Sequence, residues 1–291
     1  MNGKTCVVTG ATSGIGHATA IGLARLGAKV VIVARNPVRA AAVAAEIGKI
    51  DGAAKAEIVI ADLTEMKQVR RAADEIRARF DRVDVLVSNA GGMFDTFRES
   101  SEGIERTYAI NHLAVFLLTL SLHSSLMNSA HPRVVIVASN LQRAAYIRDY
   151  ASLVQPKYEW SQVYAQTKLR NLIFARALSA IWKADGITVN SLHPGVVDTG
   201  LMSGWTNGAM KTVLSVVQKL FLSPEKGALT SIFLASDPSV AGVTGSYFVK
   251  RTPRPHNPAA DDVAVQQQLW EESTSFLSQA GVAVPYATAL S

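Results

Sequence analysis

A tyrosine and a lysine, Tyr164 and Lys168, stand four residues apart in a segment with helical periodicity. Residues at this spacing share one helix face, so both side chains can reach the same small volume. A phenol has a pKa of about 10 and is a poor acid–base group at neutral pH unless a nearby cation stabilises its phenolate. Lys168 supplies that cation, although a tyrosine and a lysine at this spacing also occur by chance in many helices.

Two further polar residues make acid–base chemistry more specific. Ser139 follows the apolar run 134–137, and Asn111 lies in another apolar segment. Ligands of open α/β sheets bind beyond the carboxyl ends of the strands, so we expect Ser139, the segment 89–91 and a glycine-rich loop to converge on one crevice. Each residue also has a structural reading: Asn89 as a turn residue, Ser139 as a strand terminator and Asn111 as a buried helix amide.

The glycine-rich loop lies between the first apolar run and the first helical segment, where residues 9–16 read TGATSGIG. Gly10 permits a tight turn, Gly14 lets the backbone approach phosphates, and Gly16 allows close helix packing. The helix N-terminus then offers free N–H groups to anionic oxygen. A plain glycine turn is the alternative. We expect a dinucleotide pyrophosphate to contact Gly10, Thr12, Ser13, Gly14, Ile15 and Gly16.

The end of the second apolar run indicates which dinucleotide binds. It reads Val33-Ala34-Arg35-Asn36, with no carboxylate to accept from a ribose 2′-hydroxyl and with a guanidinium that can pair with a 2′-phosphate. NADP(H) is therefore the preferred cofactor and NAD(H) the alternative, unless Arg35 is simply solvated. Asp62 and Leu63 are expected beside the adenine ring, although Asp62 could instead cap the helix that follows.

Short β-branched runs alternate with helical segments along the chain. The runs are continuous rather than alternating, as expected of strands covered on both faces. The alternation predicts an α/β fold with a doubly wound parallel sheet of the Rossmann type, in a single domain. We expect residues 1–250 to form the cofactor-binding domain and residues 251–291 to pack on it as a C-terminal extension. The expected strands are 6–8, 30–33, 58–60, 85–87, 134–137 and 187–189, and the expected helices include 17–26, 37–47, 65–80 and 163–182.

Composition excludes several classes of protein. The chain has 291 residues, 48% of them hydrophobic, which excludes global disorder. Its net charge is +6, but no basic cluster is interleaved with aromatic residues, so we expect no nucleic-acid partner. One cysteine excludes an internal disulfide and suits a reducing compartment. We therefore expect no targeting peptide, no transmembrane segment and no metal site, and we expect a cytoplasmic location.

Taken together, the motifs resemble those of the short-chain dehydrogenase/reductase family. The resemblance runs from about residue 4 to residue 248, and it is closest to the retinol dehydrogenase-like branch in the segments 111–119, 192–197, 243–248 and 269–273. The long gap between Ser139 and Tyr164 is similar to that branch as well. The motifs, in the family's order, are the loop 9–16, Asp62, Asn89-Ala90-Gly91, Asn111, Ser139, Tyr164-x-x-x-Lys168 and Pro194-Gly195-x-x-x-Thr199.

The resemblance implies a role for each residue. Ser139 would orient a substrate carbonyl, and Tyr164 would donate its proton as hydride arrives from the nicotinamide. Lys168 would hold the nicotinamide ribose and lower the pKa of Tyr164. Asn111 would bind the water of a proton relay. The residues implied along the cofactor are Asn89, Ala90, Gly91, Tyr164, Lys168, Pro194, Gly195, Val197 and Thr199.

The implied activity is an NADP(H)-dependent interconversion of a ketone or aldehyde and an alcohol. One departure concerns the cofactor: the basic residue that the family often has at the position of Ser13 is absent, which leaves the 2′-phosphate mainly to Arg35. The alternative function is a catalytically silent NADP(H)-binding regulatory protein. The intact Ser139, Tyr164 and Lys168 argue against it.

Apolar segments after the fifth and sixth strands are expected to line the substrate pocket, which suits a lipophilic or ring-containing compound. The same residues could instead pack a helix onto the core or form a subunit contact. The helices expected over 102–127 and 163–182 occupy positions where the family often builds dimer contacts. The resemblance is therefore compatible with a homodimer or homotetramer and leaves the oligomeric state open. The expected pocket residues are Met93, Phe94, Leu141, Tyr158, Met202 and Trp205.

Overall fold

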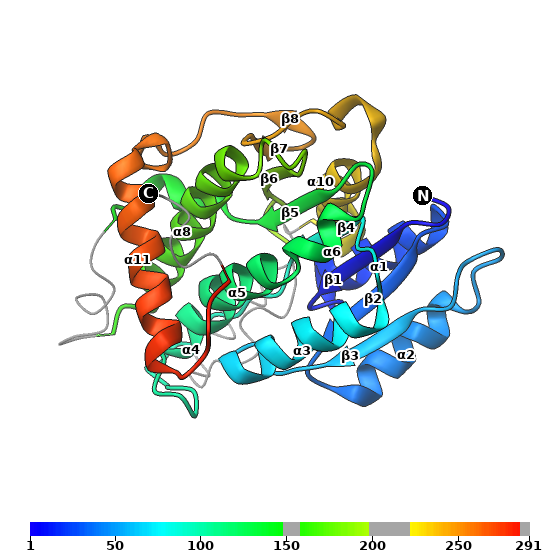
Figure 1. Cartoon of the computed structure of the whole chain (residues 1–291), viewed down its shortest axis with the longest axis horizontal. Helices are drawn as coiled ribbons and strands as arrows, with labels where there is room; N and C mark the ends of the chain where they lie inside the picture. Colours follow the sequence, from blue (N-terminus) through cyan, green and yellow to red (C-terminus); the bar gives the residue numbers. More distant parts are fainter. Residues whose placement is uncertain (148–157, 198–221, 286–291) are drawn as a thin grey trace.

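The computed structural model describes residues 1–147, 158–197 and 222–285, and the remaining residues lie outside the described part (Figure 1). Its eight-stranded sheet has the order β3-β2-β1-β4-β5-β6-β7-β8, and every neighbouring pair is parallel except β7 and β8. The predicted doubly wound α/β fold is confirmed, with two strands added to the six expected. The strands are β1 (Thr5–Thr9), β2 (Lys29–Ala34), β3 (Glu57–Ile60), β4 (Val85–Ser88), β5 (Arg133–Val137), β6 (Thr188–His193), β7 (Tyr247–Val249) and β8 (Thr252–Pro253).

Helices cover both faces of the sheet. Successive residues of a strand point to opposite faces, so alternate strand residues pack against the two helix layers. Val7 and Val31 pack with α3 (Met66–Arg79), α5 (Ala114–Ser121) and α8 (Trp160–Ile181). Their strand neighbours Cys6 and Val30 pack on the other side with residues of α1 (Gly14–Arg25), α2 (Pro37–Ile47) and α10 (Pro224–Ser236). Shorter elements are α4 (Arg106–Tyr108), η1 (Ala109–Leu113), α6 (His123–Met127), η2 (Asn140–Ala144), η4 (Pro238–Val240) and η5 (Pro258–Asp261).

The start of α2 shows why the local sequence forms a helix there. Asn36 precedes the helix, and its Oδ1 accepts a hydrogen bond from the Arg39 N–H at 3.0 Å. Pro37 occupies the first helical position, where its missing N–H costs nothing. The cap and the proline together place the helix at the predicted residues 37–47.

The segment predicted as one helix over residues 102–127 is broken instead. After α4, the chain widens into the π-helical turn η1 and then continues as α5 and α6. Asn111 lies in the middle of this wide turn, and every residue of α5 is buried. Wide turns of this kind often occur at functional sites, because they re-aim a side chain or a carbonyl group.

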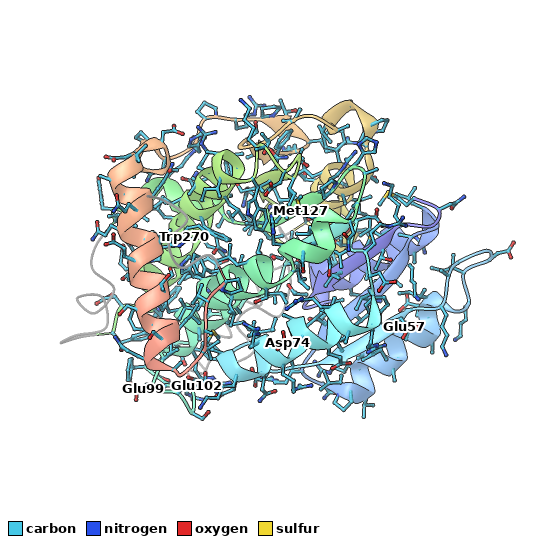
Figure 2. All side chains as sticks on the ribbon, in the orientation of Figure 1. Glu57, Asp74, Glu99, Glu102, Met127 and Trp270 are labelled. Carbon is cyan, nitrogen blue, oxygen red and sulfur yellow. The ribbon has the colours of Figure 1, made fainter. Side chains whose placement is uncertain are left out.

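The C-terminal helix α11 (Val263–Gln279) packs against the main body of the chain beside α8 (Figure 1). Its Trp270, labelled in Figure 2, lies with its ring 5.0 Å from Phe116 of α5 and 6.0 Å from Phe174 of α8. The buried Arg170 forms an ion pair with Glu272 at 3.1 Å. These contacts support the proposal that residues 251–291 extend the main domain.

None of the helices in the described ranges is both long and apolar enough to cross a bilayer.

The turn between β7 and β8 predicts a way to stabilise the protein. Lys250 (φ 51°) and Arg251 (φ 64°) form a two-residue turn in the left-handed region, where Asn-Gly is strongly preferred. We expect the double variant Lys250→Asn/Arg251→Gly to raise the free energy of unfolding by about 1 kcal/mol in urea denaturation. A Lys250→Ala/Arg251→Ala variant, which removes the same charges, should not do so. Equal stabilisation by both variants would assign the effect to charge rather than to backbone conformation.

Candidate active site

Four of the sequence motifs meet at one edge of the sheet. Gly10 follows β1, Asn89 follows β4, Ser139 follows β5 and Pro194 follows β6. These strands are parallel neighbours, so their carboxyl ends lie side by side. The strand order reverses between β1 and β4, and ligands of open α/β sheets bind at such a switch point.

The loops after β1 and β4 are locked together by Thr9. Its Oγ accepts hydrogen bonds from the Asn89 and Ala90 N–H groups, both at 2.9 Å. Asn89 Nδ2 donates in turn to the Thr9 carbonyl at 2.9 Å. A Cβ atom on Gly16 would lie 2.3 Å from Asn89 Nδ2, and one on Gly10 would lie 2.9 Å from Ala90 Cα. The side chain of Asn89 therefore holds the two loops together, and the glycines allow their close approach.

The N-terminus of α1 fits an anionic group. Ser13 occupies the N-cap position, and within the described ranges its side chain makes no capping hydrogen bond. The helices α2, α10 and α11 are each capped by a side chain, from Asn36, Ser223 and Asp262 respectively. The first N–H groups of α1 are thus left for another acceptor, and a phosphate oxygen satisfies such groups well.

Arg35 and Asp62 lie together at the ends of β2 and β3. The Arg35 guanidinium is 3.5 Å from Asp62 Oδ2. Asp62 Oδ1 accepts from the N–H and the hydroxyl of Thr64, at 2.9 and 2.8 Å. Burial raises the pKa of Asp62, but the hydrogen bonds from Thr64 and the charge of Arg35 outweigh it and hold the pKa below its usual value. Asp62 thus caps the turn before α3, and the side chain of Leu63 is buried in the core.

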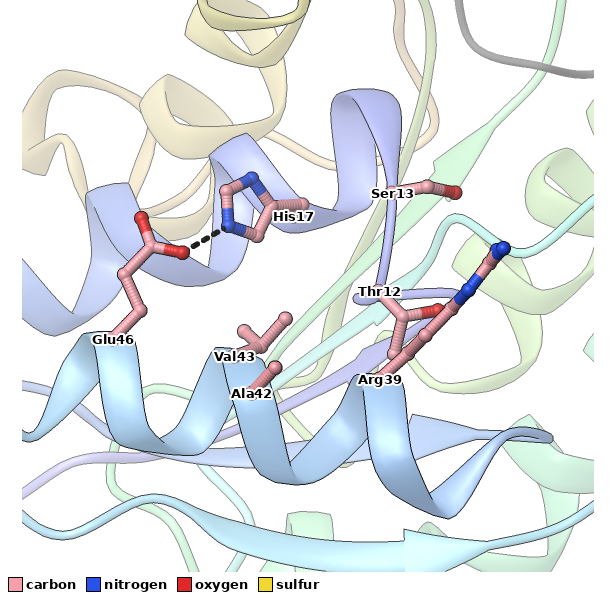
Figure 3. Close-up of a pocket in the computed structure, with 7 residues that line it drawn as sticks. All are labelled: Thr12, Ser13, His17, Arg39, Ala42, Val43 and Glu46. Atoms are coloured by element: carbon pink, nitrogen blue, oxygen red, sulfur yellow. Dashed lines mark hydrogen bonds and ion pairs between the residues drawn. The ribbon is translucent and has the colours of Figure 1, made fainter.

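A pocket of about 320 Å³ opens between α1 and α2, next to the glycine-rich loop (Figure 3). Arg39 extends along it toward Thr12 and Ser13, and at its other end His17 Nε2 lies within hydrogen-bond distance of Glu46 Oε2, at 2.7 Å. Arg39 makes no ion pair with any residue that the structure describes. No sequence motif singled out Arg39, although a second arginine four positions after Arg35 is a usable signal. The lining residues are Thr12, Ser13, His17, Arg39, Ala42, Val43 and Glu46.

Tyr164 and Lys168 are both buried on α8, with 7% and 3% of their surface exposed. Lys168 Nζ donates to the Val137 carbonyl at the end of β5 at 3.1 Å, and it lies 5.6 Å from the centre of the Tyr164 ring. Burial lowers the pKa of Lys168 to about 8 and raises the pKa of Tyr164. The expected lowering of the Tyr164 pKa by Lys168 is not seen in this structure, where the ammonium is directed to the Val137 carbonyl.

Asn111 holds the loop after β4 against Lys168. Its Oδ1 accepts from the Gly92 N–H at 2.8 Å, and its Nδ2 donates to the Gly92 carbonyl at 2.9 Å. A Cβ atom on Gly91 would lie 2.9 Å from Asn111 Oδ1 and 3.5 Å from Lys168 Nζ. Because Gly91 has no side chain, the loop after β4 can approach both the Asn111 amide and the Lys168 ammonium.

The turn that carries Ser139 is supported from β6 and β7. Ser139 Oγ accepts from the Leu141 N–H at 3.3 Å, and the next residue, Asn140, donates its N–H to His193 Nδ1 at 3.3 Å. The Tyr247 hydroxyl donates to Asn140 Oδ1 at 2.9 Å. Burial lowers the pKa of His193 to about 4, which keeps its ring neutral and able to accept. No sequence motif singled out these two supporting residues for this task.

The segment after β6 packs against Leu222. Gly195 has a φ of +97°, and a Cβ atom there would lie 2.6 Å from the Leu222 side chain. Val197 pairs with Leu222 in a short parallel bridge. Pro194, Gly195 and Val197 thus follow the carboxyl end of β6, while Thr199 lies outside the described residues.

The expected pocket residues differ in their burial and in their contacts. Met93 is buried, and Phe94 lies beneath the Arg106 guanidinium, 5.0 Å from its ring centre. Leu141 is 47% exposed. The Tyr158 hydroxyl donates to the buried carboxylate of Glu105 at 2.9 Å, so this phenol anchors the chain before α8. Met202 and Trp205 lie outside the described residues.

The burial of Lys168 predicts a pH-dependent cost in stability. Its folded-state pKa of about 8 lies below the ordinary value of 10.5. The cost of the buried charge is therefore fully present below pH 8 and disappears as the pH rises through 10.5. Without cofactor, we expect Lys168→Met to be more stable than the wild type by about 2 kcal/mol at neutral pH, and the gain to shrink at about pH 10.

The measurement is chemical denaturation at both pH values, with Lys183→Met, which changes an exposed lysine just after α8, as the matched control. A Lys168→Met variant that is less stable than the wild type at neutral pH would contradict the account.

Comparison with known proteins agrees with this arrangement. Residues 4–209 match the family model of the short chain dehydrogenases. Human retinol dehydrogenase 14 is 35% identical over 288 residues, covering 94% of this chain and 86% of the relative. A protein of Streptomyces sp. (strain C5), whose name proposes a daunorubicin C-13 ketoreductase, is 35% identical over 274 residues, covering 94% of this chain and 92% of the relative.

A solved structure from Beutenbergia cavernae with bound NADP superimposes with a TM-score of 0.68 at 30% identity, covering 86% of this chain and 96% of the other. The chain therefore belongs to the short-chain dehydrogenase/reductase family, in its retinol dehydrogenase-like branch.

Proposed function

We propose that this oxidoreductase uses NADP(H) to interconvert a ketone or aldehyde and an alcohol on a lipophilic small molecule. Tyr164 is the general acid and base, Ser139 orients the carbonyl oxygen, Lys168 holds the nicotinamide ribose, and Asn111 holds the loop beside them. The observation that carries the proposal is the buried ammonium of Lys168, placed beside Tyr164 at the switch-point edge of the sheet.

A buried cation in this place is hard to explain by stability alone. Lys168 makes no ion pair within the described ranges, and burial lowers its pKa to about 8, so keeping it charged costs free energy. Strongly shifted groups in a crevice are typical of functional sites. Next to an electron-rich ligand, such as a pair of ribose hydroxyls, the same ammonium gains hydrogen bonds in addition to the one it donates to Val137.

The proton chemistry follows from the environment of Tyr164. A bound NADPH would supply the hydride for the carbonyl carbon, and the protein must supply the proton. Burial raises the pKa of Tyr164, so its phenol stays protonated at neutral pH and can donate. The alkoxide that develops on the substrate is far more basic than a phenolate, because its conjugate acid has a pKa near that of water, about 15.7. Proton transfer from Tyr164 to this oxygen is therefore downhill, as reduction of a carbonyl requires.

The preference for NADP(H) is supported by two arginines. Arg35 stands at the end of β2, and Arg39 extends along the pocket beside the glycine-rich loop. In this family the adenosine half of the cofactor follows that loop, so a 2′-phosphate would lie within reach of both guanidinium groups. The NADP in the Beutenbergia cavernae structure supports the same choice.

A lipophilic substrate is supported by the apolar side chains near the site and by the relatives. Met93 and Phe94 follow the loop that Asn111 holds, and neither is charged. The names of two similar proteins refer to retinol and to daunorubicin, both large and ring-containing. We therefore propose a substrate of this general size and polarity. A screen of lipophilic ketones, aldehydes and alcohols, followed by NADPH absorbance, identifies it.

Removal of the Tyr164 hydroxyl tests the reaction itself. We expect Tyr164→Phe to lower kcat at least about 100-fold, because the proton donor is lost. NADPH affinity, measured by fluorescence titration, should stay within about twofold of the wild type, because the hydroxyl is not needed for dinucleotide binding. Unchanged turnover in Tyr164→Phe would contradict the proposal. Unchanged biological activity without turnover would favour the regulatory protein.

Cofactor preference is tested at the two arginines. We expect Arg39→Ala to weaken NADPH binding about tenfold, since a charge-assisted hydrogen bond contributes about 1.5–3 kcal/mol, and to leave NADH binding unchanged. Arg35→Asp should reverse the preference toward NADH. The control is Arg25→Ala, which removes an exposed charge at the end of α1. Equal affinities of the wild type for the two cofactors would contradict the assignment.

A further inference from the structure

A run of buried polar side chains connects α11 with Asn111. Ser273 Oγ lies 2.8 Å from His112 Nε2, and His112 Nδ1 lies 3.3 Å from Asn171 Oδ1. Asn171 Nδ2 then donates to the main-chain carbonyl of Asn111 at 2.8 Å. None of the four residues exposes more than 1% of its surface. The C-terminal helix thus reaches the candidate active site through three polar contacts in the interior.

The ring in the middle of this run is neutral. Burial, together with the charge of Arg170, lowers the pKa of His112 to about 3. A neutral imidazole has one nitrogen that donates and one that accepts, and the partners decide which is which. The ring also stacks on Tyr108, with 5.4 Å between ring centres, so its orientation is fixed.

The amide of Asn171 determines the direction of the hydrogen bonds. Its Nδ2 donates to the Asn111 carbonyl, so Oδ1 faces His112 and can only accept. His112 Nδ1 must carry the proton if it is to hold Asn171, and Nε2 then accepts from the Ser273 hydroxyl. That hydroxyl also lies 2.7 Å from the Leu269 carbonyl, so its single hydrogen can be donated either to His112 Nε2 or to this carbonyl.

Donation from the Ser273 hydroxyl to His112 is favoured over donation to the Leu269 carbonyl. The Leu269 carbonyl lies within a continuous helix and has a backbone partner there. Asn171 Oδ1 has no donor other than His112 among the residues that the structure describes. A buried amide oxygen left without a donor costs free energy, whereas a second bond to a helix carbonyl adds little.

The end of the run matters because of what Asn111 does. Its carbonyl lies in the wide turn η1, and its side chain clamps both polar groups of Gly92. The neighbouring Gly91 is the point where this loop passes Asn111 and Lys168. A shift of η1 would therefore move the loop, the amide and the surroundings of the Lys168 ammonium together.

We propose that Asn171, held by His112 and Ser273, is a positioning residue that fixes Asn111, so that the C-terminal helix takes part in setting the active-site geometry. The inference rests on the proposed function for its kinetic consequence. Its structural part, the direction of the hydrogen bonds, stands independently of any activity.

The direction is tested by ¹⁵N NMR of protein labelled on histidine, with the His112 signals identified by their loss in His112→Phe. We expect a neutral ring with the proton on Nδ1 between about pH 5 and 8, and a shift toward the Nε2-protonated form in Asn171→Leu. A wild-type ring protonated on Nε2 would overturn the proposal, because that ring repels Asn171 instead of holding it.

The kinetic consequence is tested with single and double variants. His112→Phe keeps the size and stacking of the ring, and we expect it to lower kcat about tenfold while KM and NADPH affinity change by less than about twofold. Ser273→Ala alone should lower kcat about threefold, and it should have no further effect in the His112→Phe background, because the run is already broken. If His112→Phe does not fold, the effect of Ser273→Ala on kcat tests the positioning role, and an unchanged kcat in that variant would overturn it.

The matched control is Trp270→Phe, which weakens the packing of α11 without touching the polar run. It should lower the Tm and leave kcat unchanged. Variants of the run that lower the Tm but not kcat, or a full additive effect of Ser273→Ala in His112→Phe, would overturn the positioning role. Absence of Tyr164-dependent turnover in the wild type would overturn the proposed function and this role with it, while the NMR result alone decides the hydrogen bonds.

Discussion

The ammonium of Lys168 is the constraint on which the rest of the site depends. It is nearly fully buried, and its one hydrogen bond within the described ranges goes to the Val137 carbonyl. Any group near it must be small, neutral or electron-rich, and the surroundings meet this condition. Gly91 provides the space, the Tyr164 ring presents its π-face, and Asn111 presents an amide oxygen toward the loop. The free-energy cost of burying the Lys168 charge thus falls where hydrogen bonds to a bound ligand can offset it.

Several residues that the family resemblance assigns to the cofactor-binding loops also hold the structure together. Thr9 and Asn89 join the loops after β1 and β4 across the switch point, and Gly16 is required by that contact. Asp62 caps a turn and pairs with Arg35. The structural and functional readings of these residues are therefore not alternatives, because a loop must first be rigid before it can hold a phosphate in a fixed place.

Local signals in the sequence predicted much of the fold. The helical period of residues 37–47 indicated α2, and continuous apolar runs indicated the central strands. The structure adds the cap from Asn36 at the start of that helix. The helix α10 was not predicted, and the helix expected over 102–127 is interrupted at Asn111. Contacts between distant segments could not be predicted: Glu102 caps α3 from 36 residues away, and Ser273 meets His112 across 161 residues. Partners of this kind are selected by the tertiary fold, and no local pattern records them.

The central claim is that Tyr164 serves as the proton donor and that Lys168 controls its acidity once a cofactor is present. The most direct measurement is an NMR titration of protein labelled with ¹³C at the tyrosine Cζ, without and with NADP⁺. The account predicts that Tyr164 titrates above the ordinary value of 10 in the free protein, because of burial, and at a clearly lower pH with NADP⁺ bound. A Tyr164 signal that titrates at the same pH in both states would contradict it.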